Sequence, residues 1–146
     1  MEKLVRQLKK DYPHISFTVG TAHAWQSSKQ SILYAPGGGA AGLLHELGHA
    51  SLGHTNYASD IELLQKEIDA WQEAQRLADR YGHIIDPNHM QDCLDTYRDW
   101  LYKRSRCPVC EATGIQRAAK AYACLNCRQE WQVTNARLCR VYRRCS

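Results

Sequence analysis

The chain lacks the features that mark membrane and secreted proteins. It contains no run of 18 apolar residues, so no segment is predicted to span a membrane. The first residues, Met1 to Arg6, have neither the apolar stretch nor the small-residue cleavage site of a signal peptide. Cysteine is missing before Cys93, which excludes a disulfide framework spread over the chain. We therefore expect a cytoplasmic protein with no membrane partner.

Internal repeats and low-complexity tracts are also missing, and 146 residues suit one compact domain with a small addition. We predict a first domain over residues 1–105 and a second module over residues 106–146. The net charge of +4 is distributed unevenly between the two ends. Residues 1–98 carry nine Lys/Arg and twelve Asp/Glu, whereas residues 99–146 carry ten and three. This asymmetry indicates a nucleic acid or another acidic partner at the basic C-terminal module, although a solvated basic surface explains the charge equally well.

The hydrophobic pattern predicts short strands followed by longer helices, which is an α+β arrangement. The small sheet is expected to be antiparallel and to precede two packed helices. Gly53 and Gly82 are expected to end helices, and Pro87 to open one. Strands are predicted at residues 15–19, 21–26 and 31–35, and helices at residues 2–11, 40–52, 60–81 and 87–104.

Residues 45–49 read His-Glu-Leu-Gly-His inside the predicted helix 40–52. Positions four apart lie on one face of a helix, so His45 and His49 can bind the same metal ion. Glu46 is offset from that face and can reach a water molecule rather than the metal. Two histidine ligands beside a carboxylate base are the arrangement of a zinc hydrolase. The alternative interpretation is a chance match on an amphipathic helix.

A catalytic zinc ion needs a third protein ligand, which this motif does not supply. His54 is the nearest candidate. On a continuous helix it would lie about 180° from His45, so the chain would have to turn at Gly53 first. His54 therefore stays an alternative third ligand.

The predicted helix 60–81 offers two glutamates as the other candidates. Glu62 falls on its solvent face, whereas Glu67 falls on its apolar face. A carboxylate on an apolar face is unfavourable unless something pairs with it, and a zinc ion is such a partner. The pattern therefore favours Glu67, while a side chain at the edge of the apolar face that reaches water is the other interpretation of this residue.

Two segments, His45–His54 and Glu67–Ala74, resemble the gluzincin metallopeptidases, in particular the ImmA/IrrE-like group and the minigluzincins. Those families pair a His-Glu-x-x-His helix with a following helix that contains Glu-x-x-Ala. The resemblance covers roughly residues 15–80 and implies a zincin-like active-site helix and a glutamate helix. It implies His45, His49 and Glu67 as ligands of a catalytic Zn²⁺, and Glu46 as the general base. It also implies that the strand Ser31 to Ala35 is the edge along which an extended polypeptide substrate binds.

The cysteines of the C-terminal module form two Cys-x-x-Cys pairs. Cys107 and Cys110 are separated from Cys124 and Cys127 by 13 residues, which predicts a closed four-cysteine site for a structural Zn²⁺ in a zinc ribbon. Paired or free thiols are the alternative. Three cysteines receive no role from the sequence, namely Cys93, Cys139 and Cys145. Four residues are candidates for stabilising an oxyanion, with nothing to choose among them: His23, Tyr57, His83 and His89.

The expected function is therefore a zinc-dependent metallopeptidase that hydrolyses peptide bonds with a zinc-activated water and Glu46 as general base. The gluzincin groups do not usually carry a C-terminal zinc ribbon. SprT-like proteases, which act on protein crosslinked to DNA, combine both features, but their downstream His-Gly segment is missing here. A non-enzymatic zinc-ribbon adaptor is the rival from another class, with phosphate contacts from Arg137, Arg140, Arg143 and Arg144.

Overall fold

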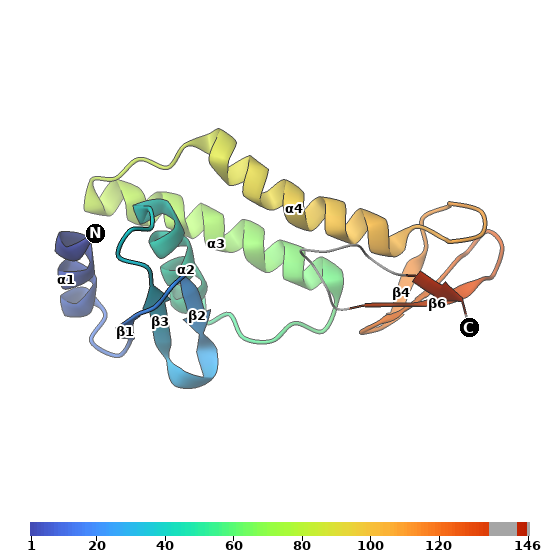
Figure 1. The fold of residues 1–146 in the computed structure, drawn as a ribbon, viewed down its shortest axis with the longest axis horizontal. Coiled ribbons are helices and arrows are strands. Elements are labelled where there is room, and N and C mark those ends of the chain that lie inside the picture. Colours follow the sequence, from blue (N-terminus) through green and yellow to red (C-terminus); the bar gives the residue numbers. More distant parts are fainter. Residues whose placement is uncertain (135–142, 146) are drawn as a thin grey trace. The chain divides into compact units, whose positions relative to one another are not determined.

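The computed structural model describes residues 1–134 and 143–145. Over these residues the chain is α+β, with four α-helices and two small sheets (Figure 1). A short 3₁₀ helix, η1 (Ser27–Lys29), follows the second strand. The α-helices are α1 (Glu2–Asp11), α2 (Ala40–Ser51), α3 (Asp60–Tyr81) and α4 (Pro87–Ser105). The strands are β1 (Ser16–Val19), β2 (Ala24–Gln26), β3 (Ser31–Tyr34), β4 (Ile115–Ala118), β5 (Ala121–Ala123), β6 (Glu130–Val133) and β7 (Arg143–Cys145).

The chain forms two compact units. The first unit comprises Met1–Asn56 and Gln65–Met90, and the second comprises Tyr57–Leu64 and Gln91–Ser146. The first unit therefore contains the His-Glu-Leu-Gly-His segment and Glu67, and the second contains the two Cys-x-x-Cys pairs. The domain boundary predicted near residue 105 stays a prediction.

The sheet of the first unit is mixed, which corrects the antiparallel sheet that we predicted. The strand order is β1-β3-β2, with β1 parallel to β3 and β2 antiparallel to it. After β1 the chain crosses to the far side of the sheet as β2, and returns as the central strand β3. Strand β3 is therefore paired on both sides, by β1 over Ser31–Tyr34 and by β2 over Ser31–Leu33, so the prediction that this strand is an open edge for substrate was wrong.

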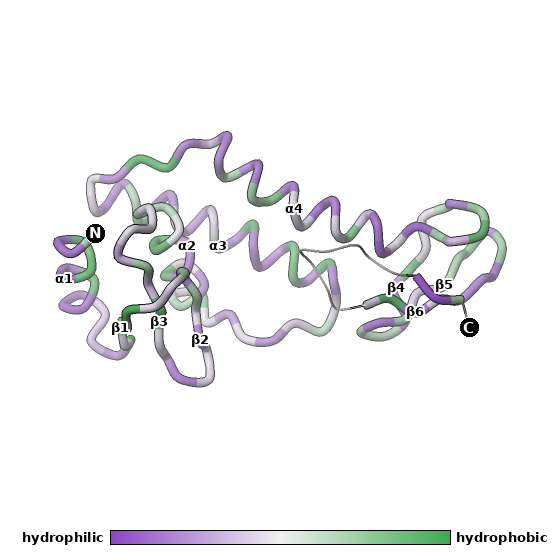
Figure 2. Tube along the Cα trace, viewed as in Figure 1, coloured by the Kyte–Doolittle hydropathy of each residue, from purple (hydrophilic) through white to green (hydrophobic). Residues whose placement is uncertain are grey.

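The core of the first unit is built by the apolar faces of its helices against the sheet. Along each helix, apolar residues recur between polar ones (Figure 2). The predicted apolar face of α1 is confirmed, because Leu4, Val5 and Leu8 are buried. Helix α2 is held by Leu43, Leu44 and Leu47, all fully buried. No helix in the part of the chain that the structure describes is long and apolar enough to cross a membrane.

The predicted helix ends at Gly82 and Pro87 are confirmed, and the structure adds a capping residue, Ser59. Ser59 caps α3, because its Oγ accepts a hydrogen bond from the Glu62 N–H at 3.1 Å. Gly82 follows α3 with φ of +68°, a left-handed conformation that glycine adopts without strain. Pro87 is the first residue of α4, where its missing N–H leaves no helical hydrogen bond unmade.

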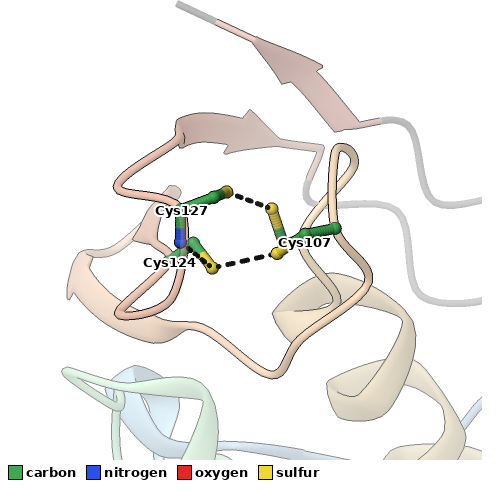
Figure 3. Close-up of side chains that lie close together, drawn as sticks. Cys107, Cys124 and Cys127 are labelled. Atoms are coloured by element: carbon green, nitrogen blue, oxygen red, sulfur yellow. Dashed lines mark hydrogen bonds between the residues drawn. The ribbon is translucent and has the colours of Figure 1, made fainter.

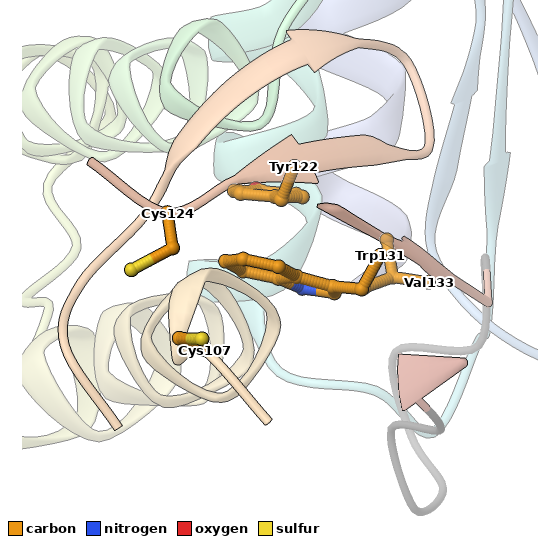
Figure 4. Close-up of a cluster of buried hydrophobic side chains, with 5 residues drawn as sticks. All are labelled: Cys107, Tyr122, Cys124, Trp131 and Val133. Carbon is orange, nitrogen blue, oxygen red and sulfur yellow. The ribbon is translucent and has the colours of Figure 1, made fainter. Parts of the chain in front are cut away.

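The second unit carries an antiparallel sheet in the order β4-β5-β6-β7. Its apolar core contains Tyr122 and Trp131, whose rings stack 5.7 Å apart beside Cys107 and Cys124 (Figure 4). Trp131 is completely buried, and its indole N–H donates to the Arg104 carbonyl at 3.0 Å. The packing of β5 and β6 is thus tied directly to the C-terminal end of α4 within this unit.

Candidate metal centres

Two imidazoles from one face of α2 converge in the first unit. His45 and His49 lie one turn apart, and their Nε2 atoms are 3.1 Å from each other. The two rings are almost perpendicular, with centroids 4.6 Å apart. Their side chains are 10 % and 13 % exposed, so both nitrogens lie largely out of water.

Glu67 of α3 brings a carboxylate to the same point. Its Oε2 lies 3.2 Å from His45 Nε2 and 3.6 Å from His49 Nε2, and its side chain is 8 % exposed. Burial opposes ionisation of this carboxyl group. Hydrogen bonding to the two histidines outweighs that burial and lowers the pKa of Glu67 to about 2. Glu67 is therefore an anion at neutral pH, as a metal ligand has to be.

The glycine of the motif lets α2 and α3 approach closely enough for this contact. A Cβ atom at Gly48 would stand 2.5 Å from the carbonyl oxygen of Ala70 and 3.3 Å from its Cα. Only glycine fits there without moving one of the two backbones. Ala70 lies one turn after Glu67, so the crossing point at Gly48 places the carboxylate opposite the two histidines.

The three ligand atoms have the spacing of a zinc site. In a tetrahedral site with bonds of about 2.0–2.1 Å, neighbouring ligand atoms lie about 3.3 Å apart. The distances here are 3.1, 3.2 and 3.6 Å. Two imidazoles and one carboxylate also form a donor set that catalytic zinc ions use. We call His45, His49 and Glu67 the His₂Glu site, and its residues fit Zn²⁺.

Glu46 lies beside this site without joining it. Its Oε2 accepts a hydrogen bond from the backbone N–H of Trp25 at 2.6 Å. Trp25 is the middle residue of β2. This strand is at one edge of the sheet and packs against α2. The carboxylate of Glu46 is thus held by the sheet, while His45 and His49 turn toward Glu67.

His54 also lies outside the set of converging ligand atoms. Its Nδ1 is 2.9 Å from Nδ1 of His49, the nitrogen of His49 that does not face His45. Burial lowers the pKa of His54, and the neighbouring His49 and Lys66 lower it further. The structure therefore brings Glu67 to the two motif histidines, and brings His54 to the other nitrogen of His49.

Trp71 packs against His45 and was not singled out from the sequence as part of the site. Its ring centroid is 4.3 Å from that of His45, and His89 lies edge-on to Trp71 at 5.8 Å. Trp71 follows Glu67 by four residues on α3, so both side chains point the same way. This spacing is the sequence signal that could have found it. The Nδ1 atom of His45 is buried with no hydrogen-bond partner among the described residues.

Of the four oxyanion candidates, His23 lies near Glu46. Burial lowers the pKa of His23, and the charge of Glu46 opposes this effect. The His23 ring fills the space that the side chains of Gly38 and Gly42 would occupy, and its Nδ1 accepts the Ala35 N–H at 3.4 Å.

The other three oxyanion candidates differ in their exposure to solvent. Tyr57 and His89 are exposed and His83 is half-buried.

The two Cys-x-x-Cys pairs converge in the second unit (Figure 3). The Sγ atoms of Cys107 and Cys127 are 3.6 Å apart, and those of Cys110 and Cys124 are 3.5 Å apart. A tetrahedral zinc ion with bonds of about 2.3 Å would separate its sulfur ligands by about 3.8 Å. All four sulfurs lie within 4.8 Å of one another, so this four-cysteine cluster also fits Zn²⁺.

The two pairs have the same backbone structure. Glu111 N–H bonds the Cys107 carbonyl at 3.0 Å, and Arg128 N–H bonds the Cys124 carbonyl at 3.1 Å. Both residues have left-handed backbones, with φ of +60° and +64°. Each pair is thus a tight turn that aims both of its sulfurs inward.

Hydrogen bonding and burial shift the pKa values of the sulfurs in opposite directions. Hydrogen bonds from the Ala112 N–H and the Asn126 side chain lower the pKa of Cys110 to about 6. For Cys127, a backbone hydrogen bond from Gln129 lowers the pKa, but burial and the neighbouring sulfurs outweigh it and raise the pKa to about 12. Four sulfurs this close cannot all ionise unless a cation balances their charge.

The remaining cysteines stay outside the cluster or outside the described residues. Cys93 is half-buried on α4, and Cys145 is exposed on β7. Cys139 lies outside the residues that the structure describes, as do Arg137 and Arg140. The structure therefore draws neither Cys93 nor Cys145 into a metal-binding group.

No family model, curated protein or solved structure matches this chain.

Proposed function

We propose that the protein is a zinc-dependent metallopeptidase of the gluzincin type, with a structural zinc ribbon. The observation that carries this proposal is the position of Glu67. This buried carboxylate from α3 meets both histidines of α2 at 3.2 and 3.6 Å, while Glu46, on the same helix as the histidines, stays outside the ligand set. Three ligands plus one separate carboxylate is the arrangement that a zinc hydrolase needs.

His45, His49 and Glu67 would hold the metal. When bound there, zinc would lower the pKa of a water molecule toward about 7 and polarise the scissile carbonyl group. Glu46 acts as the general base. Its carboxylate, held by the Trp25 N–H, takes the proton of the attacking water and later delivers it to the leaving amine.

The substrate in this proposal is an extended polypeptide that pairs with β2 rather than with β3. Strand β2 is at the edge of the sheet, and the Trp25 N–H points away from β3 toward Glu46. The N–H and C=O of one strand residue point to the same side, so the outer side of β2 lies next to the proposed base. An added strand on that side would run past Glu46 and pair with the Trp25 C=O, because the Trp25 N–H is already bonded to Glu46.

The experiment is cleavage of an unstructured protein by the full chain and by Glu46→Gln. The variant should keep about two zinc ions per chain and lose cleavage by a factor of about 10²–10⁴, because only the base is removed. Glu2→Gln, the same change at an exposed position of α1, is the control and should cleave normally. Normal cleavage by Glu46→Gln would show that Glu46 is not the base.

The second candidate is a non-enzymatic adaptor that binds nucleic acid or an acidic protein; a SprT-like protease delivered to nucleic acid would combine both activities. The observation that favours it is the pair of exposed arginines, Arg143 and Arg144, on strand β7. Phosphate binding by such residues weakens steeply as salt rises. Titration of the full chain with DNA and RNA at several salt concentrations tests this candidate independently of cleavage.

A further inference from the structure

We propose that His54 is a positioning residue, which accepts a hydrogen bond from His49 and thereby fixes the tautomer and ring orientation in which His49 can bind metal. This inference rests on the metal site of the proposed function, but not on peptide hydrolysis. Its basis is the 2.9 Å contact between the Nδ1 atoms of the two rings, whose centroids lie 5.1 Å apart at an interplanar angle of 64°.

A count of protons decides which ring donates. A hydrogen bond between two nitrogens needs one proton and one lone pair, so only one of the two Nδ1 atoms carries hydrogen. The Nε2 atom of His49 faces His45 and Glu67, and a histidine ligand binds metal through a lone pair. Neutral His49 then carries its proton on Nδ1 and donates it. His54 therefore accepts at Nδ1 and carries its own proton on Nε2.

The backbone after α2 is folded so that this contact forms. The Gly53 N–H bonds the Ala50 carbonyl at 3.1 Å, and the His54 N–H bonds the His49 carbonyl at 2.9 Å. These two bonds, with Gly53 at φ of +65°, form a Schellman motif. In that motif the residues at the positions of His49 and His54 usually make an apolar contact. Here two imidazoles take those positions, so the end of α2 places His54 against the proposed metal ligand His49.

The edge strand holds His54 from its other side. The indole N–H of Trp25 donates to the His54 carbonyl at 2.9 Å. The backbone N–H of the same residue donates to Glu46 at 2.6 Å. Trp25 thus connects β2 both to the proposed base and to the residue that orients His49. Partners of this kind, which bond the free nitrogen of a metal-bound histidine, typically change metal affinity by 10- to 100-fold when they are removed.

The test measures zinc affinity by competition with a chelator, using the full chain, so that it does not depend on catalysis. His54→Ala should weaken zinc binding at the His₂Glu site by about 10- to 100-fold and leave the four-cysteine cluster unchanged. His54→Leu should behave like His54→Ala, because it fills the space without an acceptor. His54→Asn should restore most of the affinity, because its amide oxygen can accept the His49 proton. Nitrogen NMR of the zinc-loaded chain should show His49 protonated at Nδ1.

Three outcomes overturn the inference. Zinc affinity of His54→Ala or His54→Leu equal to that of the unchanged chain would show that the side chain has no role. Complete loss of one zinc ion in His54→Ala and His54→Asn alike would make His54 a ligand. If His54→Asn does not restore zinc affinity, and the metal-free variants all melt at the same temperature, then accepting a hydrogen bond from His49 is not what His54 contributes. Normal cleavage by Glu46→Gln would refute Glu46 as the base but would not change these zinc affinities. Failure of the proposed function and failure of the proposed role of His54 are therefore distinguishable.

Discussion

Gly48 lies so close to Ala70 that a Cβ atom on it would stand 2.5 Å from the Ala70 carbonyl oxygen. This contact joins the helix that carries His45 and His49 to the helix that carries Glu67. Because it is a contact with backbone, the neighbour cannot give way by a side-chain rotation. The glycine is therefore a condition for the spacing of the three ligand atoms as well as a packing residue.

Gly48→Ala should accordingly push α2 and α3 apart. We expect destabilisation of about 1–3 kcal/mol from overpacking, despite the better helix propensity of alanine, which opposes it by about 1 kcal/mol. Zinc binding at the His₂Glu site should weaken together with stability. Chemical denaturation and a zinc titration measure the two effects. Gly39→Ala is the control, because nothing lies within 4 Å of a Cβ at that position; equal results for both variants would contradict the prediction.

Glu67→Ala tests the third ligand directly. Removal of this carboxylate leaves two histidines, which hold zinc weakly. Zinc content should fall from about two ions to about one ion per chain, with the remaining ion in the four-cysteine cluster. Glu73→Ala, on the same helix but paired with Arg76 at 3.1 Å, should keep both ions. If Glu67→Ala retains two zinc ions, Glu62 or an acid outside α3 becomes the better candidate.

Cys110→Ala tests the four-cysteine cluster. Loss of one sulfur should remove the structural zinc ion and leave the His₂Glu site loaded, because the two groups of ligands share no residue. Trp131, which is fully buried beside Cys107 and Cys124, should become more exposed, and its fluorescence should shift to the red. Cys93→Ala, outside the cluster, should bind two zinc ions and leave the fluorescence of Trp131 unchanged.

A buried ion pair stabilises the second unit. Asp60 and Arg104 have side chains that are each 2 % exposed, and the Arg104 Nε lies 2.6 Å from Asp60 Oδ2. Tyr122 donates to the same oxygen at 2.5 Å, and Arg104 also donates to the carbonyls of Thr134 and Ala119. Asp60→Ala would leave the charge of Arg104 buried without its carboxylate partner.

We expect Asp60→Ala to lower the free energy of unfolding by about 3–5 kcal/mol, because an uncompensated charge stays buried. Asp99→Ala is the matched control. It breaks an exposed pair with Lys103 at 3.6 Å and should change stability by less than about 1 kcal/mol. Urea unfolding followed by circular dichroism measures both. A change below about 1 kcal/mol for Asp60→Ala would mean that water reaches Arg104.

Local signals in the sequence predicted the elements well. Helix 60–81 is confirmed. Ser59 caps its first turn and Gly82 ends it in a left-handed conformation, and both effects depend only on neighbouring residues. The proximity of His45 to His49, and the inward turn of each Cys-x-x-Cys pair, follow from spacings of three or four residues along one chain segment. Such features need no knowledge of the rest of the molecule.

These local signals could not predict the order of the strands in the sheet. The hydrophobic pattern of residues 31–35 indicated a strand. When both faces of a sheet are covered, however, a central strand and an edge strand have the same hydrophobic pattern. Only the crossing of the chain from β1 to β2 and back decided that β3 is central. The same crossing placed Trp25 next to Glu46, a contact between residues 21 positions apart that no local pattern encodes.

The sequence by itself therefore determined which side chains can act as metal ligands, because a helix repeat and a tight turn bring near neighbours together by local geometry alone. Tertiary structure decided the partners of those ligands. Whether Glu67 or His54 meets the two motif histidines depends on how closely two helices pack at Gly48 and on which way the chain turns at Gly53. The packing at Gly48 joins distant segments, so one added methyl group there would change which atoms meet. The left-handed turn at Gly53 is local, but the indole N–H of Trp25, from a distant strand, bonds the His54 carbonyl that follows it.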